Sequence, residues 1–408
     1  MPPPPARRID LDVLRVFACY LLIPFHVAMV FNPAPFYHVR NADLSEVAMI
    51  ACGFVSLWHM PLIFLLAGWS AFASYRVRGL RRFGQERVRR LVVPLVAGCA
   101  LLAPGIKYLE LRSGLDLSYS GLRVSEALQA GFRPLIPNGL PVAAPFGESF
   151  FEFLPTFYTQ LDRFTWSHLW FIAYLLAFSA VVLPLLAALA RSRFGVARVS
   201  RLWAYAPLVP LVAIQLVLRE RWPGPYNLVA DWANFGFFLT FLVTGVVMAR
   251  LPAFEDAIDA ERWRALAIAG AALALLLALV LGRLAAPKLL AVGAAVAGWC
   301  CVVALLGFVR SRAPRAGPRL DALAESALPV YLLHQPVIVV LGYGVVALPF
   351  GIAVKFVLLL ALASGATVAL YAIARRHPVA RFLLGMRPLA PQALGAGAAP
   401  VQARVAEA

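Results

Sequence analysis

One apolar segment of this sequence carries two residues that could do acid–base or charge chemistry. Residues 11–31 read LDVLRVFACYLLIPFHVAMVF, with Arg15 near one end and His26 near the other. In a helix this spacing places both side chains within about 20° of one face and about 16 Å apart along the axis. Histidine is well suited to take a proton at neutral pH, and arginine binds anions. The pair therefore predicts a ligand groove along one helix face.

Each of the two residues also has a plainer interpretation. Arg15 could extend to the membrane surface and pair with Asp12, three residues before it. His26 could be a neutral, hydrogen-bonded residue that packs between helices. The sequence alone leaves these alternatives open.

Three further histidines lie within or at the edge of apolar segments. His59 and His168 begin such segments, and His334 lies in the middle of another, directly before Gln335. A polar side chain in lipid is costly and is commonly functional or paired. We expect a polar cavity that opens outward, with His26 and His334 as its deeper members. Each histidine alone could still be a helix-packing residue.

The elements that must hold these side chains are membrane helices. The chain of 408 residues is 62% hydrophobic and 14% charged, against roughly half and a quarter in soluble domains.

The net charge of +17 falls in short connectors without a nucleic-acid motif, so we expect no nucleic-acid partner. The five cysteines lie in apolar segments without metal-ligand spacing, so we expect neither a metal site nor disulfides. The first segment is too long for a cleavable signal peptide and should remain as a span.

The apolar segments predict an all-α integral membrane protein with about ten transmembrane helices. Their expected ranges are 11–31, 48–74, 91–111, 168–190, 203–218, 233–250, 265–282, 288–309, 324–346 and 350–374. Most basic residues fall on one side if the N-terminus is inside, which predicts that both termini are cytoplasmic.

This topology divides the chain into three expected parts. Residues 1–10 form a cytoplasmic segment, 11–376 the membrane domain, and 377–408 a cytoplasmic, disordered tail. Within the domain, a long connector at about 112–167 faces outward. Its aromatic part, residues 145–161, predicts a short amphipathic helix at the interface.

The order of the motifs resembles the polytopic membrane acyltransferases of family 3. The matching segments are LDVLR with the Arg15–His26 spacing, HMPLIFLLAG in the second expected span, RVRRLVVP after it, HLWFI at 168–172 and YLLHQP at 331–336. Ala67 stands where the family commonly has serine. The resemblance covers about residues 8–376. Within the family, IPFHVAMVF, YHVRNADLS and SHLWFI resemble the branch that succinylates periplasmic glucans.

This resemblance implies an acyl-CoA-dependent O-acyltransferase of a bacterial inner (plasma) membrane. It would move an acetyl or succinyl group from cytoplasmic acyl-CoA, a donor substrate rather than a bound cofactor, to a hydroxyl of an extracytoplasmic glycan. Arg15 and His26 carry over as the essential pair, His26 as general base or as the carrier of an acyl-histidine, and His334 joins them as a catalytic candidate. Substrate contacts are expected from four residues: His59, His168, Trp170 and Gln335.

The nucleotide end of coenzyme A would need positive charge at the cytoplasmic side. A connector at 76–90 reads RVRGLRRFGQERVRR, and guanidinium groups bind phosphates well. The same arginines could instead serve only to fix the topology. We expect five of them to bind the donor together with Arg15: Arg81, Arg82, Arg87, Arg89 and Arg90.

Other classes of membrane protein could use the same residues. Intramembrane Arg and His facing a cavity would suit a transporter or proton-coupled flippase equally well. The sequence has no visible internal repeat, which argues against inverted-repeat transporters. A structural subunit would have no need for Arg15 and His26 on one face. A labelled acyl-CoA that releases free coenzyme A would separate these alternatives.

Overall fold

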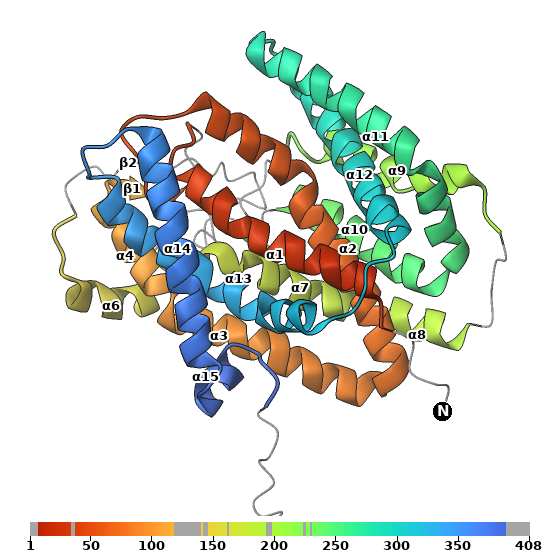
Figure 1. The fold of residues 1–408 in the computed structure, drawn as a ribbon, viewed down its shortest axis with the longest axis horizontal. Coiled ribbons are helices and arrows are strands. Elements are labelled where there is room, and N and C mark those ends of the chain that lie inside the picture. Colours follow the sequence, from red (N-terminus) through yellow and green to blue (C-terminus); the bar gives the residue numbers. More distant parts are fainter. Residues whose placement is uncertain are drawn as a thin grey trace, which may run out of the picture.

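The computed structural model describes residues 7–33, 37–117, 140–141, 146–160, 163–192, 198–222, 226–228 and 231–388, and within them the chain is mostly helical (Figure 1). The elements are α1 (Ile9–Met29), α2 (Glu46–Arg87), the π-helix η1 (Val88–Val92), α3 (Val93–Leu101), α4 (Ala103–Arg112), β1 (Leu115–Asp116), β2 (Leu140–Pro141), α6 (Phe150–Thr159), the 3-10 helix η2 (Ser167–Leu169), α7 (Trp170–Val181), α8 (Leu183–Arg191), the 3-10 helix η3 (Arg201–Tyr205), α9 (Leu208–Val217), α10 (Trp232–Arg250), α11 (Pro252–Leu281), α12 (Pro287–Ser311), α13 (Pro318–Val345), α14 (Ile352–Ala374) and α15 (Pro378–Leu383).

Helix α1 is the element on which the predicted site depends. Its buried residues Leu11, Leu14, Ala18 and Leu22 recur at helical spacing and face the core. The helix packs against α13, α2 and α14, and Figure 1 shows it crossing the middle of the molecule. Packing of α1 on α13 brings the expected first and ninth spans into contact.

The contact between α2 and α10 depends on two glycines. A Cβ added to Gly68 of α2 would lie 1.9 Å from the carbonyl oxygen of Leu242. A Cβ added to Gly245 of α10 would lie 1.9 Å from that of Leu65. Small residues let membrane helices approach closely in this way. The glycine pair therefore fixes α2 at backbone contact distance from α10.

The all-α membrane class is confirmed, but fewer helices than ten meet the length of a complete span. The described residues contain seven helices long and apolar enough to cross a membrane, or eight if one bent pair counts as a span. The expected second and third spans form one helical run, residues 46–112, which Gly79 interrupts at φ 69°. The expected fourth span is bent by 48° between α7 and α8. The expected fifth span, 203–218, corresponds to a shorter apolar helix over residues 201–217.

The long connector is only partly described. The predicted helix in its aromatic part is present as α6, which a capping box of Ser149 and Glu152 begins. Phe153 and Phe157 are fully buried on one side of α6, whereas Phe151 is exposed. Strands β1 and β2 pair antiparallel, and the rest of the connector lies outside the described residues.

The tail begins with ordered structure, in contrast to the disorder expected from residue 377. Helix α15 follows α14 directly, and Arg381 within it is buried. Its guanidinium donates hydrogen bonds to the carbonyl oxygens of Arg375 and Arg387 and to the carboxylate of Glu325. These bonds satisfy the buried charge and hold α15 to the domain. Residues 389–408 lie outside the described part of the chain.

Candidate active site

Two of the predicted histidines form a direct contact between α1 and α13. The Nε2 atom of His334 lies 2.9 Å from Nδ1 of His26. His334 is fully buried, whereas His26 is partly exposed. Aromatic rings surround His26, with Phe25 at an edge and Tyr37 stacked at a centroid distance of 5.8 Å. The structure therefore brings together two residues that the sequence placed in different spans.

The hydrogen bonds of this histidine dyad fix which nitrogen carries each proton when both rings are neutral. His334 Nδ1 lies 3.0 Å and 2.8 Å from the carbonyl oxygens of Val330 and Tyr331, which can only accept, so it carries a hydrogen. His334 Nε2 is then an acceptor, and His26 Nδ1 carries a hydrogen that it shares between this nitrogen and the carbonyl oxygen of Leu22, 3.1 Å away. His26 Nε2 then carries no hydrogen, and its lone pair makes no hydrogen bond within the residues that the structure describes. This nitrogen is the one able to take a proton from a substrate.

His168 lies beside the dyad. Its ring meets that of His334 edge-on at a centroid distance of 5.6 Å. Its Nε2 donates to the carbonyl oxygen of Leu332 over 3.1 Å, which leaves Nδ1 as an acceptor. In the part of the chain that the structure describes, this buried Nδ1 has no hydrogen-bond partner, and neither has the buried Oε1 of Gln335. Both atoms could receive a hydrogen bond from a ligand.

The other two expected substrate contacts lie in packing environments. His59 is buried and bonds through Nε2 to the carbonyl oxygen of Ala18 over 2.7 Å, which ties α2 to α1. This position favours the helix-packing interpretation for His59. Trp170 packs on the ring of Tyr226 at 4.4 Å. Burial raises the pKa of Tyr226 to about 12, so its phenol stays protonated at neutral pH.

Arg15 lies at the opposite end of α1 from the dyad and makes no contact with it. It pairs with Asp12 at 2.9 Å, as the plainer interpretation of the sequence expected, and donates to Ser70 Oγ of α2 over 2.9 Å. Its side chain remains 36% exposed. Asp12 is shared with Arg7 at 2.7 Å, so it does not neutralise Arg15 alone.

The structure brings together some of the expected donor-binding arginines but not all of them. The guanidinium of Arg90 is close enough to those of Arg15, Arg78 and Arg387 to be repelled by them. We call these four residues the arginine cluster. Arg78 and Arg387 were not expected from the sequence as donor-binding residues, although Arg78 stands in the basic connector, where its charge was a usable signal.

The remaining connector arginines point elsewhere. Arg89 donates to the carbonyl oxygen of Met386 over 2.8 Å. Arg87 lies over the ring of Phe83 at 4.6 Å. Arg81 and Arg82 are exposed. Arg87 is still close enough to Arg90 and Arg78 to be repelled by them, but among these five only Arg90 interacts with Arg15.

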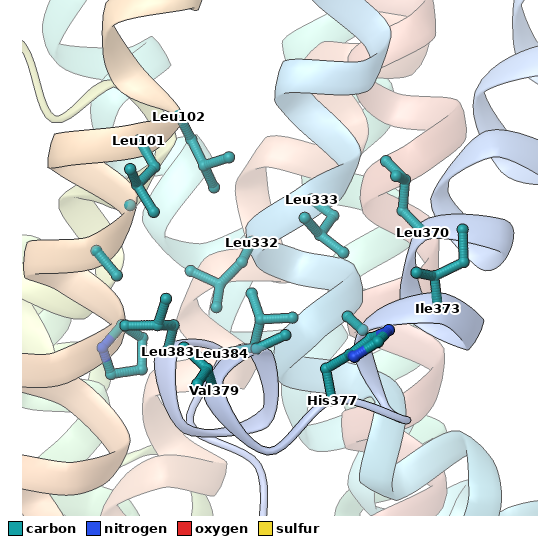
Figure 2. A pocket seen from close by; sticks show the side chains of 15 residues that line it. Leu101, Leu102, Leu332, Leu333, Leu370, Ile373, His377, Val379, Leu383 and Leu384 are labelled. Atoms are coloured by element: carbon teal, nitrogen blue, oxygen red, sulfur yellow. The ribbon is translucent and has the colours of Figure 1, made fainter.

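An apolar cavity of about 470 Å³ lies between α3, α13, α14 and α15 (Figure 2). Figure 2 shows leucine side chains from these elements pointing into it, with the ring of His377 at its edge. Leu332 and Leu333, directly before His334, form part of one wall. The described residues contain no group of three His, Cys, Asp or Glu side chains placed to hold a metal ion.

Comparison with known proteins gives the family of the chain. A family model described as an acyltransferase domain matches residues 8–376. Glucans biosynthesis protein C of Escherichia coli strain K12 is 26% identical over 122 residues, which cover 30% of this chain and 31% of that protein. The protein of the same name from E. coli strain SMS-3-5 matches with the same figures. The match thus spans less than a third of these curated relatives. No solved structure matches the chain.

Proposed function

Because this chain belongs to the membrane acyltransferase family whose domain model covers residues 8–376, we propose that it moves an acyl group from cytoplasmic acyl-CoA to a hydroxyl of an extracytoplasmic glycan. The group is succinyl or acetyl, and the protein lies in the inner membrane of a bacterium with both termini in the cytoplasm. The printed name of the E. coli relatives supports a glucan as the acceptor. The observation that carries the proposal is the histidine dyad with its free nitrogen.

In this proposal His26 is the general base for the acceptor. A sugar hydroxyl is a poor nucleophile at neutral pH, and loss of its proton to His26 Nε2 lets the oxygen attack the acyl carbonyl. His334 holds the ring of His26 in position and accepts its Nδ1 hydrogen, so the imidazolium that forms stays oriented. The partly apolar surroundings keep competing water away from the acyl group.

The donor binds at the other end of α1. The arginine cluster, which carries more positive charge than Asp12 and Glu86 balance, is suited to the phosphates of coenzyme A. By the positive-inside rule this end faces the cytoplasm. The acyl end then extends toward His26, which lies about 16 Å further along the helix. Donor and acceptor thus enter from opposite sides.

The test is release of free coenzyme A from acetyl-CoA or succinyl-CoA by the purified protein with a glucan acceptor. His26→Ala should lower the rate by about 10²- to 10⁴-fold, because the base is lost. His377→Ala, which removes an exposed histidine at the edge of the apolar cavity, is the matched control and should act as the wild type. A wild-type protein that releases no coenzyme A would favour the transporter or flippase instead.

A further inference from the structure

A second hydrogen-bonded chain ends at a serine close to the dyad. Ser167 Oγ, at the start of η2, lies 3.0 Å from His38 Nε2. His38 Nδ1 lies 2.5 Å from Glu110 Oε2. Each of the three residues is only 1% exposed. They come from the segment between α1 and α2, from α4 and from η2, so the fold assembles a serine, a histidine and a carboxylate from three distant parts of the chain.

We call Ser167, His38 and Glu110 the relay. The hydrogen-bond partners of Glu110 and His38 determine where its protons lie. Glu110 also accepts hydrogen bonds from Lys107 Nζ at 2.6 Å and from the backbone N–H of Leu117 at 2.7 Å. An acceptor so surrounded is a carboxylate, and His38 Nδ1 therefore donates to it. His38 Nε2 is left as the acceptor for the hydroxyl of Ser167. Serine, histidine and carboxylate in this order are recognised as a nucleophile, its base and the group that orients the base.

The serine is in a conformation that ordinary loops seldom hold. Its φ is 47°, a left-handed value that costs energy in a residue with a Cβ. Its backbone N–H donates to Thr165 Oγ1 over 2.9 Å, and its Oγ accepts from Gln335 Nε2 over 3.3 Å. Both bonds hold the hydroxyl toward His38. Strained backbone of this kind clusters at functional sites.

The relay is adjacent to the histidine dyad. Gln335, which donates to Ser167, directly follows His334, and His168, which directly follows Ser167, meets the His334 ring. Two buried acceptor atoms without a partner among the described residues lie here, Nδ1 of His168 and Oε1 of Gln335. A polyhydroxylated acceptor supplies donors for both.

We propose that Ser167 carries the acyl group as a covalent ester between donor and acceptor, with His38 as its base and Glu110 as the residue that positions His38. The proposal rests on the proposed function for its thioester donor and its hydroxyl acceptor. It goes beyond that function by placing the acyl group on the protein before the acceptor reacts.

In the first step Ser167 Oγ bonds to the thioester carbonyl carbon and its proton passes to His38 Nε2. The carbon–sulfur bond breaks, and coenzyme A leaves as a thiolate. In the second step the acceptor hydroxyl loses its proton to His26 Nε2 and its oxygen bonds to the same carbon. Ser167 Oγ leaves and takes its proton back from His38. His26 then releases one proton to solvent, which balances the thiolate charge.

This sequence predicts a half-reaction that needs no acceptor. The full-length protein in detergent is mixed with acetyl-CoA or succinyl-CoA alone, quenched in acid and mapped by peptide mass spectrometry. We expect one acyl group on Ser167 and a burst of about one coenzyme A per chain. His26→Ala should retain the burst and the Ser167 ester, because His26 acts only in the second step. Ser167→Ala should lose both, and His38→Gln should slow acylation at least about a hundredfold.

Ser179→Ala is the matched control, because it removes another buried hydroxyl, bonded to the carbonyl of Leu175, from the adjoining helix. An acyl group found on His26 instead, or wild-type transfer by Ser167→Ala, would overturn the proposal. If the wild type consumes neither acetyl-CoA nor succinyl-CoA, the proposed function fails. The role of Ser167 is then tested separately, by treating the protein with phenylmethanesulfonyl fluoride. If Ser167 is sulfonylated and His38→Gln prevents this, Ser167 is supported as a nucleophile with His38 as its base. If Ser167 is not sulfonylated, the proposal is overturned.

Discussion

The two ends of α1 hold their polar side chains in opposite ways. At one end His26 is bonded to a fully buried partner, and each ring nitrogen of the dyad has a defined role. At the other end Arg15 is 36% exposed, shares its carboxylate with Arg7 and lies near further guanidinium groups. The first end is organised for moving a proton, and the second has positive charge that a bound anion would stabilise. Changes at the two ends should therefore affect different kinetic constants.

Among changes to the residues around His26 and the arginine cluster, His334→Leu should have the largest effect. Leucine cannot accept the Nδ1 hydrogen of His26, so the base loses its bond to the second ring and keeps only the bond to the carbonyl oxygen of Leu22 in its own helix, at 3.1 Å. We expect kcat to fall about a hundredfold, with the KM for acyl-CoA unchanged. Steady-state kinetics of coenzyme A release measures both constants. A kcat within twofold of the wild type would show that the dyad is only a packing contact.

Arg15→Gln should give the opposite pattern. The glutamine keeps a polar side chain near Ser70 but removes the charge, so the KM for acyl-CoA should rise about tenfold while kcat changes little. Tenfold corresponds to about 1.4 kcal/mol, the size of one hydrogen bond to a charged group. The difference in KM between Arg15→Gln and the wild type should shrink in high salt, because exposed charges are screened. An unchanged KM in low salt would remove Arg15 from donor binding.

The smallest effect comes from a matched pair of neighbouring arginines. Arg90 belongs to the arginine cluster, whereas Arg89 donates to the Met386 carbonyl. Arg90→Gln should raise the KM for acyl-CoA about threefold, and Arg89→Gln should leave it nearly unchanged, because only the first removes charge from the cluster. The KM for acyl-CoA of both variants is measured in parallel at one ionic strength. Equal effects would mean that total charge matters and position does not.

The sequence predicted the parts of this account that depend on local pattern. Helix length and hydrophobicity gave the all-α membrane class. The spacing of Arg15 and His26 placed them on one helix face, and the YLLHQP motif marked His334. The pairing of Arg15 with Asp12 followed from their separation of three residues.

The parts that the sequence could not predict depend on packing between distant segments. His26 meets His334 only because α1 lies on α13. The relay of Ser167, His38 and Glu110 has its first two members within motifs that the sequence analysis quoted, SHLWFI and YHVRNADLS, but Glu110 stands in no such motif. The direction of Arg89 depends on the ordered start of the tail, which composition alone did not reveal.

The central claim is that His26 Nε2 takes the acceptor's proton. Its most direct test is coenzyme A release by His26→Ala with a glucan acceptor, without and with added imidazole. Removal of the ring leaves space beside His334 in which a small base can act. We predict a loss of about 10²- to 10⁴-fold that imidazole partly restores, with no effect of imidazole on the wild type. A His26→Ala protein that works at the wild-type rate without imidazole would contradict the account.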